Sequence, residues 1–151
     1  TLTKYSSFPI QHFAPDRGYT RVKAYAVGEA PGVNPILAGT SAQWLGLMLG
    51  RDLAVGSDRG QVLQGDATIH VEFGATGITA DVLFSGIAVI GGGAARPDIE
   101  WHDLAMEEDA FERHESPSER IRGRFYGPGQ QEVGGIFERG TITGALGGVR
   151  D

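Results

Sequence analysis

The most regular alternation of hydrophobic and polar residues in this chain lies between positions 67 and 84. Residues 67–73 and 78–84 each place an apolar side chain at every second position, with mostly polar side chains between them. A period of two is typical of an antiparallel strand with one face buried. The segment Gly74-Ala75-Thr76-Gly77 separates the two runs and has the length and the glycines of a tight turn. We therefore predict a β-hairpin here.

The last third of the chain repeats this pattern. Apolar or small residues at 121, 123 and 125 alternate with polar ones, and Gly127-Pro128-Gly129 then turns the chain. Residues 133–138 and 141–146 predict a second hairpin around Arg139-Gly140.

Three other segments are less regular. Residues 36–53 are apolar at odd and even positions alike, which fits a strand covered on both sides. The glycines inside the run favour a strand, and a helix over 42–49 stays open as the alternative. Residues 20–27 and 98–106 predict two further strands, the second with Ile99, Trp101 and Asp103 on one face. The acidic segment 107–119 contains Pro117 and predicts a loop, with room for one helical turn near 109–113.

These segments give about eight strands in 151 residues, so the pattern predicts an all-β domain, either a small antiparallel barrel or a sandwich. The composition agrees, because 24 glycines disfavour helices and suit turns and bulges. Residues 1–19 show neither the hydrophobic period of a helix nor that of a strand. We expect them to form an irregular extended segment that packs its aromatic side chains on a single domain at 20–151.

Charge and cysteine content exclude several classes of protein. The net charge of −6 disfavours a protein that binds nucleic acid or an anionic membrane. The absence of cysteine excludes disulfides, thiol nucleophiles and cysteine-bound metals within this chain. No apolar run is long enough for a transmembrane helix, so we predict no transmembrane segment in this chain.

The sequence offers little for catalysis. The four histidines have no spacing that is typical of a metal site, and no serine lies in a nucleophile motif. We predict no catalytic residues, no metal site and a protein that is not an enzyme.

The run Arg122-Gly123-Arg124-Phe125-Tyr126-Gly127-Pro128-Gly129-Gln130-Gln131-Glu132-Val133-Gly134-Gly135-Ile136-Phe137 resembles the GxFYGPxAxExGGxF segment of the β-barrel domain in transferrin-binding protein B and its bacterial relatives. Residues 142–147 are similar to the closing strand of that domain. Residues 39–46 and the hairpin at 66–84 are similar to its opening strands, so the resemblance covers roughly 39–148 in order. Gln130 or Gln131 stands where the family has alanine, and Leu146 where it has phenylalanine.

The resemblance implies an eight-stranded antiparallel up-and-down β-barrel that is exported to the cell surface or periplasm, or secreted. Surface lipoproteins of that family carry a lipid-modified cysteine. Because this chain has none, we expect the anchor to lie outside it or the protein to be released. The family role implied is capture of a ligand, either haem or a host or bacterial partner protein, so haem is the one cofactor to consider. The alternative is a structural or export module of a larger surface protein, with binding done elsewhere.

Recognition is expected in loops at the barrel mouths, at 28–35 and 91–119, because the wall itself is committed to packing. A haem site needs an exposed histidine with aromatic walls, and the best candidates are His102 with Trp101 and His12 with Phe13. Three arginines share one strand parity and form a candidate docking ladder for an anionic partner, unless they pair with the acidic segment before them: Arg120, Arg122 and Arg124.

Overall fold

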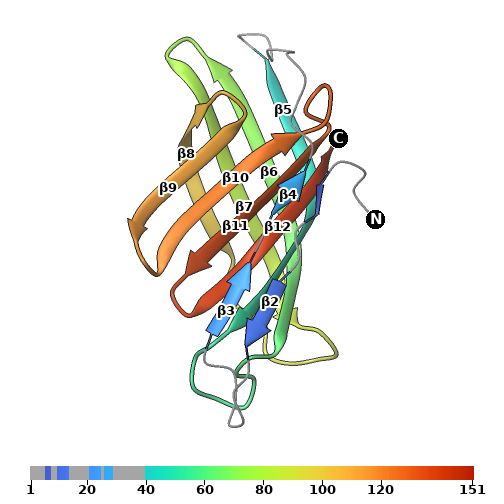
Figure 1. The fold of residues 1–151 in the computed structure, drawn as a ribbon, viewed down its shortest axis with the longest axis vertical. Helices are drawn as coiled ribbons and strands as arrows, with labels where there is room; N and C mark the ends of the chain where they lie inside the picture. The colour runs from blue at the N-terminus through green and yellow to red at the C-terminus, as the bar shows by residue number, and fades with distance from the viewer. Residues whose placement is uncertain (1–5, 8–9, 14–20, 25, 29–39) are drawn as a thin grey trace.

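The computed structural model describes residues 6–7, 10–13, 21–24, 26–28 and 40–151, with the backbone alone for 6–7, 10–13 and 21–23. The described residues are all β, without a helix, and eight strands form a closed antiparallel barrel (Figure 1). The predicted all-β class and the eight-stranded barrel are confirmed. The barrel strands are β5 (Ser41–Asp52), β6 (Val62–Gly74), β7 (Gly77–Val89), β8 (Ile99–Glu107), β9 (Ala110–Ser116), β10 (Glu119–Tyr126), β11 (Glu132–Arg139) and β12 (Ile142–Arg150).

The barrel has an up-and-down topology. Each strand pairs with the next one in the sequence, and β12 pairs with β5 to close the wall. The predicted hairpins are β6–β7, which turns between Gly74 and Gly77, and β11–β12, which turns between Arg139 and Ile142. Both are confirmed. Short connections suffice because sequential antiparallel strands need no crossover.

The helix left open at 42–49 does not form, and this segment is part of β5. Gly46 explains why the strand is favoured. It lies so close to β12 that a Cβ atom on it would overlap the backbone of Gly147. The glycine is therefore a point of close strand approach within the wall.

The loop predicted at 107–119 is wrong for most of its length. Residues 110–116 form β9, and Pro117 lies in the turn that leads to β10. The alternation was not visible in the sequence because Phe111 is the only large apolar side chain in the strand. Phe111 is buried and lies opposite Gly123 of β10, where a Cβ atom would collide with its ring. The ring of Phe111, packed over the glycine at position 123, thus fixes where β9 lies against β10.

The predicted strand at 20–27 exists in part, but it is not a barrel strand. β3 (Arg21–Ala24) pairs with β2 (Ile10–Phe13), and β4 (Val27–Gly28) pairs with β1 (Ser6–Ser7). β3 contacts β12 and β1 contacts β11, so these short strands lie against the outside of the wall (Figure 1). The strand that completes the set of eight is β9.

Aromatic side chains fill the interior of the barrel. Trp44 and Phe125 have ring centroids 4.5 Å apart, and Phe84 and Phe137 are 4.7 Å apart. Phe111 joins the first pair, at 6.1 Å from Phe125. These rings come from five different strands and are each at most 2% exposed. Phe125 and Phe137, which belong to the motif at 122–137, therefore serve the packing of the core.

Candidate functional site

Carboxylates gather on the outer wall where β7, β8 and β9 lie side by side. We call this surface the acidic face and define it by six residues that are exposed or half-exposed: Asp81, Glu100, Asp103, Glu107, Glu112 and Glu115. Asp81, Glu100 and Asp103 lie in segments predicted as strands. The other three lie in the acidic segment predicted as a loop, and the structure places them on β8 and β9: Glu107, Glu112 and Glu115.

His102 lies at the centre of the β8 part of this face. Its Nε2 atom is 3.1 Å from a carboxylate oxygen of Glu100, and its Nδ1 atom is 3.6 Å from Asp81. The hydrogen bond with Glu100, followed by the interactions with Asp81, raises the pKa of His102 above 6.5. Carboxylates on both sides favour the charged imidazolium, so this histidine gains a proton more readily than an isolated one.

A β-bulge sits beside His102. Asp103 has a positive φ of 53°, and the register of β8 on β7 shifts at this point. The backbone N–H of Asp103 donates a 2.8 Å hydrogen bond to the Asp81 carboxylate, which replaces the ladder partner lost at the bulge. The bulge also reverses the parity of β8, so that Leu104 is buried and Asp103 is exposed. The prediction that Asp103 shares the face of Ile99 and Trp101 is therefore wrong.

The wall is weakly joined on the other side of β8. Only two residue pairs connect β8 to β9, Met106 with Phe111 and Glu107 with Ala110, and both lie next to the hairpin turn. Beyond them a side chain spans the two strands, because the Arg113 Nη2 atom donates a 3.1 Å hydrogen bond to the backbone carbonyl of Asp103. We call this interval, between residues 99–105 of β8 and 112–116 of β9, the seam.

Side chains confirm that the seam is open to solvent. Phe111, Arg113 and Glu115 share one parity of β9, and Phe111 points into the buried core. The side chains of Arg113 and Glu115 are nevertheless 33% and 54% exposed. Arg113 reaches water from the parity of a core residue because the wall beside it is not closed by a ladder, whereas Glu115 lies at the register shift between β9 and β10.

Trp101 does not share a surface with His102. It is 3% exposed and packs on Phe84 and Phe137, with ring centroids 5.7 and 5.8 Å away. Adjacent residues of a strand face opposite sides, so His102 points outward while Trp101 fills the core. The pair predicted from the sequence is not brought together as an aromatic wall around a histidine. The other pair, His12 and Phe13, lies in β2, and its side chains are outside the described residues.

The arginine ladder on β10 is exposed, as its parity predicted, and it is largely paired. Arg122 and Arg124 face Glu112 and Asp109 at 3.8 and 3.1 Å, both in the acidic segment. Arg120 forms its ion pair on the other side, 2.6 Å from Glu138 of β11. The alternative in which the arginines neutralise neighbouring acids thus describes their contacts, and a docking role stays a prediction.

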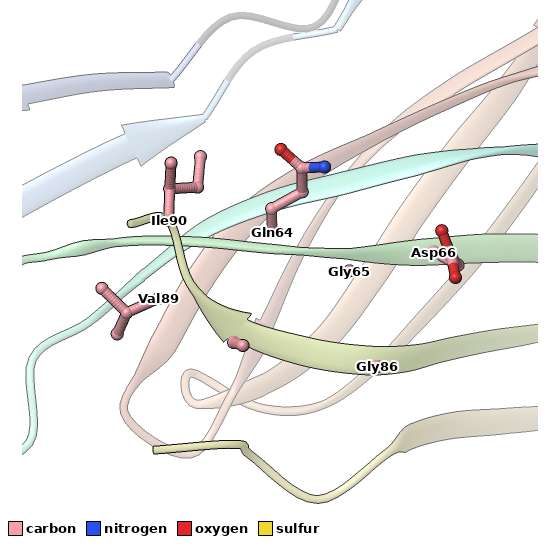
Figure 2. A pocket seen from close by; sticks show the side chains of 7 residues that line it. Gln64, Gly65, Asp66, Gly86, Val89 and Ile90 are labelled. Atoms are coloured by element: carbon pink, nitrogen blue, oxygen red, sulfur yellow. The ribbon is translucent and has the colours of Figure 1, made fainter. Parts of the chain in front are cut away.

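A second feature of the surface is an open hollow of about 290 Å³ where β6 and β7 lose register (Figure 2). Its polar side chains are Gln64 and Asp66, while Val89 and Ile90 supply apolar atoms. The left-handed Gly86 and the buried Gly65 make the bulge. One carboxylate and one amide without a basic or nucleophilic partner do not form a catalytic set.

The loops at the end of the barrel that holds residues 53–61 and 90–98 are held by a buried carboxylate that the sequence analysis missed. Asp52 accepts hydrogen bonds from the Thr141 hydroxyl at 2.6 Å, from the Ala54 N–H at 2.9 Å and from the Arg96 guanidinium at 3.1 Å. Burial by itself raises the pKa of Asp52, but these hydrogen bonds outweigh it and hold the pKa below 3.8. No local motif pointed to this cluster, since its members come from three separate segments.

The described part of the chain contains no group of three or more histidine or acidic side chains arranged to hold a metal ion. Within the same residues, no helix has the length and apolar character to cross a membrane. The loops predicted as binding elements are only partly described: Gly28 ends β4, 29–35 lie outside the described residues, and most of 91–119 is strand.

No protein-family model and no curated protein matches this chain. Among solved structures, the N-lobe domain of lactoferrin binding protein B from Moraxella bovis is similar, with a TM-score of 0.52 and 13% sequence identity. The match covers 100% of this chain and 77% of that one. At this identity the likeness shows a shared fold, and it is the transferrin-binding-protein-like barrel that the sequence resemblance implied.

Proposed function

We propose that this chain is a non-enzymatic, exported bacterial protein that binds a protein partner through its acidic face. The fold is shared with a domain of a lactoferrin binding protein, which gives the scaffold a precedent in protein capture. The sequence resemblance at 122–137 supports export. Fold alone does not determine function, so the proposal depends on the surface.

The observation that carries the proposal is the acidic face at an incompletely paired part of the wall. The interior is occupied by large aromatic side chains, so the outer surface is where recognition can take place. Six carboxylates concentrated over three neighbouring strands create a negative potential that steers a basic partner and favours its correct orientation.

Haem is not part of this proposal. The ring nitrogens of His102 face Glu100 and Asp81, and Trp101 is buried on the opposite side of the strand. An axial ligand needs a free ring nitrogen and a pocket of apolar walls beside it. Within the part of the chain that the structure describes, neither is present at His102.

The test is site-directed photo-crosslinking in bacteria that express the complete reading frame. A photoreactive amino acid replaces Glu100 in one variant and Glu72 in the control; Glu72 is an equally outward residue on β6, with a 70% exposed side chain. We expect a discrete protein adduct from position 100 and none from position 72. Cell fractionation of the same cultures checks export.

Identical adduct patterns from the two positions, or none from either, would overturn the proposal. That result would favour the alternative of a structural or export module, in which binding is done by another part of a larger protein.

A further inference from the structure

We propose that the seam between β8 and β9 receives an extended, basic segment of a partner protein, which adds to the barrel wall as an extra β-strand. This inference rests on the proposed function and specifies how the acidic face binds. The kind of ligand follows from two features of the seam, its unpaired strand edges and its charge.

The strand edges come first. β8 is paired with β7 along residues 99–105, but its opposite edge pairs with β9 only at Met106 and Glu107. β9 likewise pairs with β10 over its length while its other edge lacks a ladder beyond Phe111. Such edges present rows of backbone N–H and C=O groups, and an extended peptide satisfies them by strand addition.

The bulge at Asp103 explains why the edge stays available. A β-bulge increases the local twist and bends the strand, and here it lies three residues before Met106, the first residue of β8 that pairs with β9. The hydrogen bond that the Asp103 N–H donates to the Asp81 carboxylate stabilises this conformation from the β7 side. The seam is therefore a feature that the β7–β8 pair maintains without help from β9.

Arg113 occupies the seam in the free protein. Its guanidinium donates to the Asp103 carbonyl at 3.1 Å and lies 3.9 Å from the Glu115 carboxylate. The Arg113 side chain is one-third exposed and bonds a backbone acceptor that an added strand would use, so strand addition requires its displacement. Arg113 thus protects the edge until a ligand replaces it.

The charge of the seam selects the partner. Glu100 and Asp103 on β8 and Glu112 and Glu115 on β9 stand on both sides of it. Glu107, at the hairpin end, adds a fifth carboxylate, and Asp81 a sixth. Among the described residues, the cations within 4 Å of these carboxylates are His102, Arg113 and Arg122, so three positive groups face six negative ones. An extended segment with lysine or arginine at alternate positions would match these carboxylates while its backbone pairs with the strand edge.

The experiment uses a labelled peptide of nine residues, the length of β8, with alternating lysine and threonine. Binding to the full chain is measured by fluorescence anisotropy. A second peptide of the same sequence carries N-methyl groups on alternate backbone amides, which keeps its charge and removes its capacity to pair. We expect the parent peptide to bind at least about tenfold more tightly than the methylated one.

Charge is tested with a matched pair of protein variants. Glu100→Lys reverses a carboxylate at the seam, and Glu72→Lys makes the same change in net charge on β6. We expect Glu100→Lys to weaken binding of the parent peptide by about tenfold or more, and Glu72→Lys to weaken it by less than about twofold. Circular dichroism spectra and thermal melting of both variants check that the barrel remains folded.

Hydrogen exchange locates the contact. On adding the parent peptide, the backbone amides of the seam should exchange more slowly, while those of β6 should not change. Equal affinity for the two peptides, equal weakening by the two variants, or protection outside the seam would each overturn strand addition at this edge. The crosslinking result judges the proposed function separately, since an acidic face that binds by charge alone still gives adducts at position 100.

Discussion

The indole Nε1 atom of Trp44 donates a 2.8 Å hydrogen bond to the backbone carbonyl of Gln130, which lies 86 residues further along the chain. This buried contact joins the first strand of the barrel to the turn that connects β10 and β11. Gln130 has a positive φ of 56° and is 8% exposed. The contact therefore holds an uncommon backbone conformation in place inside the motif at 122–137.

Replacing Trp44 by phenylalanine removes this donor and leaves the Gln130 carbonyl buried without its partner. We expect Trp44→Phe to lower the free energy of unfolding by about 1–3 kcal/mol more than Trp101→Phe does. Trp101 is a suitable control because it is also buried and its Nε1 atom has no acceptor among the described residues. Urea denaturation measures both, and equal losses would contradict the assigned role of the hydrogen bond.

Gly123 faces the ring of Phe111, and a methyl group there has no room unless the ring moves. We expect Gly123→Ala to destabilise the protein by about 1–3 kcal/mol through overpacking and loss of the β9–β10 contact. Gly56→Ala is the control, because no atom lies within 4 Å of a Cβ built there. Thermal melting compares the two variants. A neutral effect at position 123 would mean that Phe111 has another place in the core.

Asp52 makes stability depend on pH at the acid end. The pKa of Asp52 is lowered in the folded state. Its carboxylate therefore stabilises the fold fully above pH 3.8, the ordinary pKa, and this stabilisation is lost as the pH falls through the lowered pKa. We expect Asp52→Asn to cost about 1–3 kcal/mol at pH 7. The difference from the natural protein should shrink at acid pH, as the pH falls from 3.8 through the lowered pKa and the carboxylate takes up a proton. Denaturation at pH 7 and at acid pH tests this, with Asp58→Asn as the control, since Asp58 lies 3.6 Å from the same arginine but is more exposed.

His102 should titrate above 6.5 because Glu100 and Asp81 stabilise its charged form. Because the pKa is raised, the stabilisation by the charged imidazolium is fully present below pH 6.5. It is lost as the pH rises through the pKa of His102 in the folded protein. NMR titration of the imidazole should show the pKa falling towards 6.5 in Glu100→Gln and unchanged in Glu72→Gln. An unchanged His102 pKa in Glu100→Gln would show that the hydrogen bond with Glu100 does not raise it.

Local pattern was sufficient for most of the barrel. Strict alternation at 67–73 and 78–84 specified β6 and β7, because a period of two has one stable solution when a single face is buried. The same reasoning gave β10, β11 and β12. It failed at β9, where a single phenylalanine marks the buried face and the other six residues of the strand are mostly polar.

The site depended on tertiary structure to a greater degree. From the sequence, Trp101 and His102 looked like neighbours on one surface, and the pleat of β8 separates them. The bulge at Asp103 carries no sequence motif of its own, since its conformation depends on the Asp81 carboxylate 22 residues away. The seam is a relationship between two strand edges, and edge pairing is decided by twist and register rather than by composition.

By itself, the sequence determined the all-β class, the principal hairpins and the position of the acidic segment, because these follow from local periodicity and composition. The tertiary structure decided which strand closes the barrel, which charges reach its outer surface, and where the wall is left unpaired. Those outcomes depend on contacts between distant residues, such as Phe111 with Gly123 and Asp103 with Asp81, and such contacts exist only once the chain has folded.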